Sequence, residues 1–71
     1  MEANIVTMQE SAINGRHVWM FKVESGLPDI LVVQHEQADK QIITEVFSNK
    51  EADKALKRYN GAVKAILSGK G

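Results

Sequence analysis

Two runs of β-compatible residues flank the dipeptide Asn14-Gly15, and this pattern predicts a tight hairpin. A two-residue type I′ turn needs positive φ at both central positions, which Asn and Gly tolerate. The two strands are therefore expected at about 4–13 and 16–24. In this hairpin Ile13 lies opposite Arg16, and the pairing continues outward one residue at a time.

The alternation of side chains in that register predicts one apolar face of the hairpin. It pairs Met8 with Phe21 and Val6 with Val23, and it puts Trp19 on the same face. Since successive side chains of a strand point to opposite faces, a slip of one residue would destroy this agreement. We therefore expect the hydrophobic core to lie on the face centred on Phe21 and Trp19.

Two further strands are expected after the hairpin. Residues 25–29 (Ser-Gly-Leu-Pro-Asp) have the composition of a turn, because Pro restricts φ and Gly permits a left-handed conformation. The run Ile30-Leu31-Val32-Val33 is apolar on both faces and predicts a central strand at 30–35. Polar residues 36–41 form the next turn, and 41–47 is expected as a fourth strand whose register stays open.

A single amphipathic helix is predicted at about 49–67. Ser48 and Glu51 have the spacing of a capping box, in which each side chain accepts a hydrogen bond from an amide at the helix start. Gly61 costs about 1 kcal/mol relative to Ala within a helix, so a break there stays open. The apolar residues that follow have the spacing of one helical face. They are Ala52, Ala55, Leu56, Tyr59, Val63, Ile66 and Leu67.

These elements define an α+β fold: a single two-layer domain spanning 1–71, with an antiparallel β-β-β-β-α arrangement and the helix on one sheet face. The fourth strand pairs either with the third or with the first. The second sheet face would then be unusually aliphatic, and large exposed apolar patches usually mark interfaces. We expect that face to mediate self-association, through Val18, Met20, Leu31 and Val33.

Size supports the same expectation. The chain has 71 residues and no cysteine. A chain of about this length buries only roughly 60% of the surface of its unfolded form, so small domains often rely on disulfides, metals or a second subunit. Without cysteine, disulfides and thiolate metal sites are excluded. A homodimer or higher oligomer is the expectation that remains.

Charge is distributed unevenly, although the formal net charge is zero. Residues 1–47 carry three basic and seven acidic side chains, a net charge of −4, whereas residues 48–71 carry six basic and two acidic ones, a net charge of +4. Such asymmetry points to interaction surfaces. Asp29, Glu36 and Asp39 are candidates for contact with a basic partner. Lys54, Lys57, Arg58 and Lys64 are candidates for contact with nucleic acid.

The sequence predicts no catalytic residue, metal site or cofactor. It has no glycine-rich phosphate loop, and its two histidines, His17 and His35, are expected to be structural strand residues. Convergence of the two on a ligand stays open. No apolar run approaches the roughly 20 residues that cross a membrane, and no signal peptide is recognisable, so a cytoplasmic location is expected.

The leading functional interpretation is a non-enzymatic protein-interaction module, a homodimeric regulator or inhibitor of a macromolecular partner. Its size is that of the small accessory proteins common in phages and plasmids. One alternative is a nucleic-acid-binding protein that uses the basic helix face. A second alternative is a small-ligand binder with a site between subunits, lined by His17, His35 and Trp19.

Overall fold

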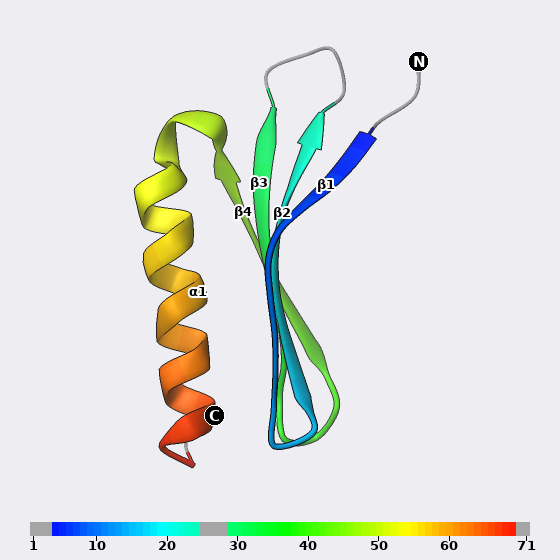
Figure 1. Cartoon of the computed structure of the whole chain (residues 1–71), viewed down its shortest axis with the longest axis vertical. Helices are drawn as coiled ribbons and strands as arrows, with labels where there is room; N and C mark the ends of the chain where they lie inside the picture. The colour runs from blue at the N-terminus through cyan, green and yellow to red at the C-terminus, as the bar shows by residue number, and fades with distance from the viewer. Residues whose placement is uncertain (1–3, 25–28, 70–71) are drawn as a thin grey trace.

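The computed structural model describes residues 4–24 and 29–69, and it confirms the predicted fold class. Its strands are β1 (Asn4–Ile13), β2 (Arg16–Glu24), β3 (Ile30–Glu36) and β4 (Ile42–Ser48). A 3-10 turn (Asn49–Glu51) leads into the helix α1 (Ala52–Leu67). The strands form one antiparallel sheet in the order β1-β2-β3-β4, so β4 pairs with β3. Helix α1 lies along one face of this twisted sheet (Figure 1).

The hairpin turn forms as predicted, with φ of 53° at Asn14 and 75° at Gly15. The predicted register also holds from the pair Ile13–Arg16 to the pair Gln9–Met20. Beyond that point a bulge between Thr7 and Gln9 shifts the register. The predicted pairs of Met8 with Phe21 and Val6 with Val23 are therefore wrong.

The shift follows from one extra residue in β1. Thr7 lies opposite Phe21 and Gln9 lies opposite Met20, which leaves Met8 without a partner in β2. A bulge of this kind places two residues against one and increases the local twist of the strand. The residues of the Asn14-Gly15 turn set the register only near the turn. They do not reveal a bulge several residues away, because a bulge depends on the twist of the whole strand against its neighbour.

The helix begins where the capping box predicts. The Glu51 carboxylate accepts hydrogen bonds from the Ser48 amide at 3.2 Å and from the Ser48 hydroxyl at 3.3 Å. The first turn is 3-10, so the α-helix itself begins at Ala52. It continues without a break through Gly61, and after Leu67 the chain turns at Gly69, which has a φ of 77°. The predicted turn over residues 25–28 lies outside the described residues.

The core lies on the sheet face opposite to the one predicted. Val18, Met20, Leu31 and Val33 are at most 4% exposed, and they pack beneath α1. They therefore belong to the core, and the prediction that they form an exposed self-association face is wrong. From the helix, the buried residues are Ala55, Tyr59, Ala62 and Ile66.

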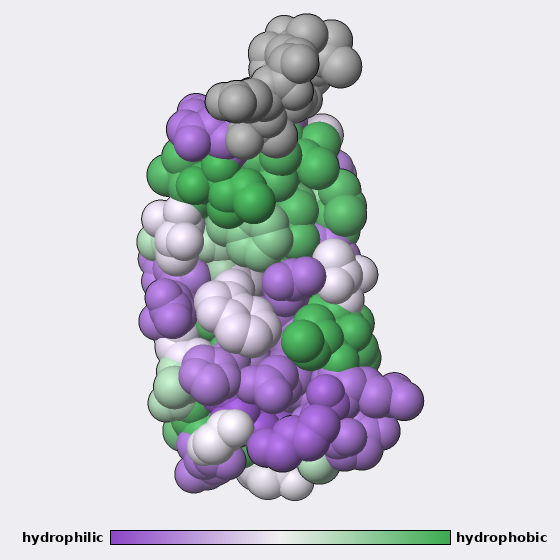
Figure 2. Space-filling model, turned by 90° about the vertical axis from the view of Figure 1, so that its right-hand side faces the viewer, coloured by the Kyte–Doolittle hydropathy of each residue, from purple (hydrophilic) through white to green (hydrophobic). Residues whose placement is uncertain are grey.

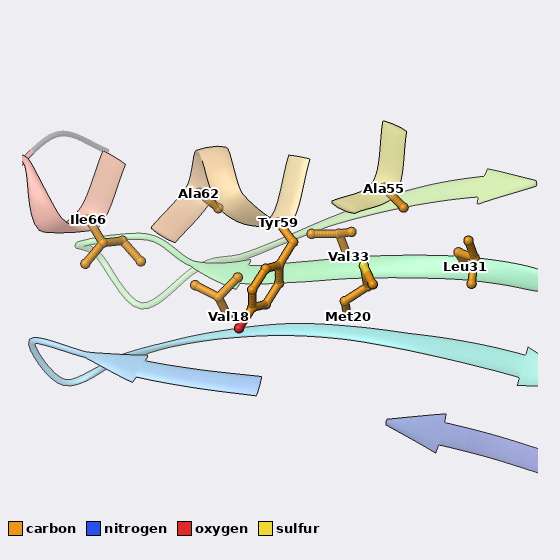
Figure 3. Close-up of a cluster of buried hydrophobic side chains, with 8 residues drawn as sticks. All are labelled: Val18, Met20, Leu31, Val33, Ala55, Tyr59, Ala62 and Ile66. Carbon is orange, nitrogen blue, oxygen red and sulfur yellow. The ribbon is translucent and has the colours of Figure 1, made fainter. Parts of the chain in front are cut away.

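Side-chain size and hydrogen bonding explain this choice of face. Two alanines of α1, Ala55 and Ala62, let the helix backbone approach the aliphatic strand residues closely. Tyr59 points from α1 toward β2 (Figure 3), and its hydroxyl forms a hydrogen bond with Ser11 of β1. A buried tyrosine hydroxyl needs such a partner, and this sheet face provides one.

The helical stripe is also centred differently from the prediction. Ala62 is buried although the predicted stripe omitted it, whereas Ala52, Leu56 and Leu67 are exposed. The buried positions 55, 59, 62 and 66 follow steps of four, three and four, which is a narrower stripe than the sequence pattern alone indicates. Leu56 and Leu67 lie on its flank.

Candidate interaction surface

The sheet face opposite α1, named here the open face, is divided into an apolar and a polar half. No described element covers it, and it carries four rows of side chains that run across the strands. The two rows nearest the start of β3 are apolar apart from one hydroxyl residue each, and they are named the apolar rows. They comprise Ile5, Val23, Ile30 and Ser48, then Thr7, Phe21, Val32 and Val46.

Exposure in the apolar rows is high at their ends and low at their centre. Ile5 of the edge strand β1 is 64% exposed and Val46 of the edge strand β4 is 61% exposed, whereas Ile30 of the inner strand β3 is 38% exposed. Val32, flanked by Phe21 and Val46, is 6% exposed. Figure 2 shows the resulting apolar patch over the upper part of this face and a mainly hydrophilic surface below it.

The polar half of the open face is held together by its own contacts. The His17 ring stacks on Trp19 with 5.4 Å between ring centroids, and its Nδ1 lies 2.7 Å from a Glu36 carboxylate oxygen. The backbone amide of His17 donates to the same carboxylate at 2.9 Å. These two hydrogen bonds hold the pKa of Glu36 below its ordinary value. Trp19, predicted to belong to the core, therefore lies in this half.

The other histidine, His35, lies on the helix side of the sheet. It is 6% exposed, and its Nε2 lies 3.3 Å from Nη2 of Arg58 and 3.7 Å from a Glu45 carboxylate oxygen. Burial, followed by the charge of Arg58, lowers the pKa of His35. Because His17 points to the opposite face, the two histidines do not converge on a ligand. No group of three or more metal-ligating side chains occurs in the described residues.

A cleft of about 260 Å³ adjoins His35. It lies between α1 and the sheet, at the end of the sheet that carries the Asn14-Gly15 turn. Its charged groups are engaged within the protein. Arg58 donates from Nε to Glu45 at 2.5 Å, and Arg16 donates from Nε to the carbonyl oxygen of Glu36 at 3.1 Å. The Arg58–Glu45 contact fastens α1 to β4, and the Arg16–Glu36 contact joins β2 to β3. The cleft is lined by Arg16, His35, Gln37, Ile43, Arg58, Ala62, Ala65 and Ile66.

The basic residues predicted to contact nucleic acid are separated by these contacts. Lys54 pairs with Glu51 at 3.1 Å, and Arg58 turns toward β4. Lys57 and Lys64 are exposed. Two of the four side chains are thus already engaged with carboxylates, which reduces the positive charge that the helix presents to solvent.

The acidic residues predicted to contact a basic partner do not share one surface. Asp29 precedes β3, whereas Glu36 ends β3 and Asp39 belongs to the following turn, where it accepts a hydrogen bond from the Gln41 amide. A strand rises about 3.3 Å per residue, so the seven residues of β3 separate the two ends by about 20 Å.

The apolar rows contain residues that the sequence interpretation did not assign to an interaction surface, among them Phe21, Val32 and Val46. Val46 is the most exposed of these three. The signal was present as the alternation along each strand, which separates Phe21 and Val23 from Met20. Sequence alone did not indicate which of the two apolar faces the helix covers.

Comparison with known proteins gives no functional assignment: no family model matches the chain, and neither a curated protein nor a solved structure is detectably similar to it. In the described part of the chain, no helix is both long and apolar enough to cross a membrane. The functional argument therefore depends on the open face and its residues.

Proposed function

We propose that this protein is a non-enzymatic interaction module that forms a homodimer through the apolar rows of its open face. The observation that supports this proposal is that both faces of the sheet carry apolar side chains, whereas α1 covers only one face and no described element covers the apolar rows on the other. Large exposed apolar patches on small domains usually mark sites of association. The proposal assigns no catalytic residue.

A second copy is the occupant that fits the apolar rows best. In a two-fold dimer the same patch meets itself, so apolar rows must pack against apolar rows. None of the residues in these rows is charged, so a strongly basic or acidic partner would find no charge complement there. Glu10 and Glu36 lie in the other half of the face, outside a contact centred on Phe21.

The hydrophobic core of the monomer is small, so a second copy would stabilise the domain by burying more apolar surface. Eight residues form the buried cluster, and the chain has no cysteine for a disulfide. Burial of apolar surface contributes about 25 cal/mol per Å². Packing the apolar rows of two copies together would add a second hydrophobic layer to a domain whose first layer is thin.

The size of the open face indicates a modest affinity. With four strands roughly 4.8 Å apart and seven residues of roughly 3.4 Å each, the whole open face covers a flat area of about 450 Å², of which the two apolar rows make up about half. A standard protein interface buries about 800 Å² on each partner. We therefore expect a dimer whose population depends on concentration, as suits a regulator or inhibitor that binds a macromolecular partner reversibly.

Sedimentation of the purified full chain at several concentrations tests the proposal. Val46→Lys places a charge at a position that is 61% exposed in the monomer and buried in the dimer. Leaving an unpaired charge in the interface should weaken the dimer at least about 100-fold, equal to about 2.7 kcal/mol.

Ile42→Lys is the matched control. Ile42 lies on the same strand and face and is 53% exposed, but it lies opposite Glu36 in the polar half. It should change the dissociation constant less than about threefold, or less than about 0.7 kcal/mol. A wild-type chain that stays monomeric at every concentration would refute the proposal, as would equal weakening by both variants.

A further inference from the structure

The outer edge of β1 is a second surface of this sheet with which no other described strand pairs. In the strand order β1-β2-β3-β4, β1 pairs on one side with β2. It has ten residues, and all of those from Asn4 to Glu10 are exposed. The unpaired amides and carbonyls of such an edge can accept another strand.

Few protective features guard this edge. Natural proteins shield edge strands with lysine, proline, inward-pointing charges or bulges. β1 has no lysine or proline, and its one charged residue is Glu10. The bulge at Met8 divides it into two regular stretches, Asn4–Thr7 and Gln9–Ile13. Each stretch keeps an extended backbone with an open edge.

The flank of α1 on the same side is apolar. Arg58 contacts Glu45 of β4, so the opposite flank of the helix faces β1. That flank carries Leu56, Val63 and Leu67, of which Leu56 is 39% exposed and Leu67 is 65% exposed. The β1 side of the molecule therefore combines an open strand edge with exposed leucines, whereas the β4 side carries the ion pair of Arg58.

We propose that the β1 edge is a second self-association surface, at which β1 of one copy pairs antiparallel with β1 of another. The two sheets of four strands would then form one continuous sheet, and the strand from the second copy would run along the apolar flank of α1. This inference goes beyond the homodimer of the proposed function and does not require it.

Charge and area both favour a second copy at this edge. Because Glu10 is the one charge in β1, antiparallel self-pairing brings like charges together only in the single register that places Glu10 opposite its own counterpart. The flat area of the apolar rows is well under half of the roughly 800 Å² that a standard interface buries per partner, so pairing at the β1 edge would supply additional contact. The face and the edge are separate surfaces, so a second copy can bind at each of them, and two perpendicular two-fold axes would give a closed tetramer.

Amide hydrogen exchange of the full chain at several concentrations tests the edge directly. β4, the other edge strand of the same sheet, is an internal control. We expect exchange of β1 amides to slow at least tenfold as the concentration rises, while β4 amides do not change. Concentration-independent exchange in β1, at the rate seen in β4, would overturn the proposal.

β1 is longer than β4, so a direct comparison of the two strands also compares different lengths. A pair of lysine variants, one in each edge strand, avoids this difference. Met8→Lys places a charge at an exposed residue that has no partner in β2, so it should remove the protection of β1 while exchange in β3 and α1 stays unchanged. Thr44→Lys is the matched change at an exposed position of β4 and should have no effect on β1. Protection of β1 that survives Met8→Lys at all concentrations would contradict edge pairing.

The variant Val46→Lys separates this inference from the proposed function. If edge pairing is correct, β1 of this variant remains protected at high concentration, and the chain sediments at no more than twice the monomer mass. Dimers of the wild type whose β1 amides exchange freely would support the open face and refute the edge. Protected β1 amides, together with a sedimenting mass that Val46→Lys does not change, would support pairing at the edge and refute the dimer through the open face.

Discussion

Val33→Ala and Val46→Ala make the same chemical change on opposite faces of the sheet, so together they test which face the helix covers. Val33 lies in β3 and is 0% exposed beneath α1, whereas Val46 lies in β4 on the open face and is 61% exposed. We expect Val33→Ala to destabilise the monomer strongly and Val46→Ala to leave its stability nearly unchanged.

The magnitude follows from burial. Val33→Ala removes two buried methyl groups, which contribute about 0.8 kcal/mol each. A remaining cavity of about 50 Å³ adds about 1.2 kcal/mol at about 24 cal/mol per Å³, so the free energy of unfolding should fall by about 2.5–3 kcal/mol. Stability of about 0.05–0.15 kcal/mol per residue gives this domain about 4–11 kcal/mol. A single valine therefore accounts for a large share of it. Val46→Ala should cost at most about 0.5 kcal/mol.

Urea unfolding at a concentration where the wild type sediments as a monomer measures both values. With a slope of about 1 kcal/mol per molar urea, Val33→Ala should lower the midpoint by about 2.5–3 M and Val46→Ala by about 0.5 M or less. A cost below about 1 kcal/mol for Val33→Ala, together with a larger cost for Val46→Ala, would refute the reasoning. The helix would then cover the other face of the sheet.

Two further predictions concern the helix and its contact with β4. The pKa of His35 is lowered in the folded protein by burial and by Arg58, so the folded state takes up a proton less readily than the unfolded state. The stability from this group is complete above the ordinary histidine pKa of 6.5 and is lost as pH falls from there through the lowered folded value. Unfolding midpoints measured from pH 8 to about pH 5 should decline below about 6.5, and His35→Gln should flatten the decline; an unchanged decline in that variant would assign it to other groups. Gly61→Ala should stabilise the chain by up to about 1 kcal/mol, because the added Cβ would meet only the end of the Arg58 side chain, at 3.9 Å. Loss of stability in this variant would show that α1 is not continuous at residue 61.

Local features were predictable because short-range chemistry decides them. Asn14-Gly15 permits the positive φ values of the hairpin turn, and the structure has them. Ser48 and Glu51 mark the start of the helix through hydrogen bonds between residues three apart. The bulge at Met8 was not predictable in this way, since it changes pairing partners without leaving a turn residue in the sequence.

The candidate interaction surface was predictable only in part. The sequence indicated that both sheet faces are apolar and that one would remain uncovered. The sequence interpretation placed Val18 and Met20 on the uncovered face, where the structure has Trp19 and Phe21. A pattern of apolar and polar positions does not distinguish these two pairs, because all four residues count as apolar. Strand alternation specifies which residues share a face, and it carries no information about which face a distant helix will choose.

The sequence by itself determined the order of elements, the antiparallel hairpin and the amphipathic helix, because these depend on backbone preferences and on spacing between near neighbours. Only the tertiary structure decided which face is buried and which edge is open. Burial depends on the fit between α1 and the sheet: Ala55 and Ala62 allow close approach, and Tyr59 finds Ser11 as a partner. These contacts join residues far apart in the chain, and they leave the apolar rows and the edge of β1 uncovered by any described element.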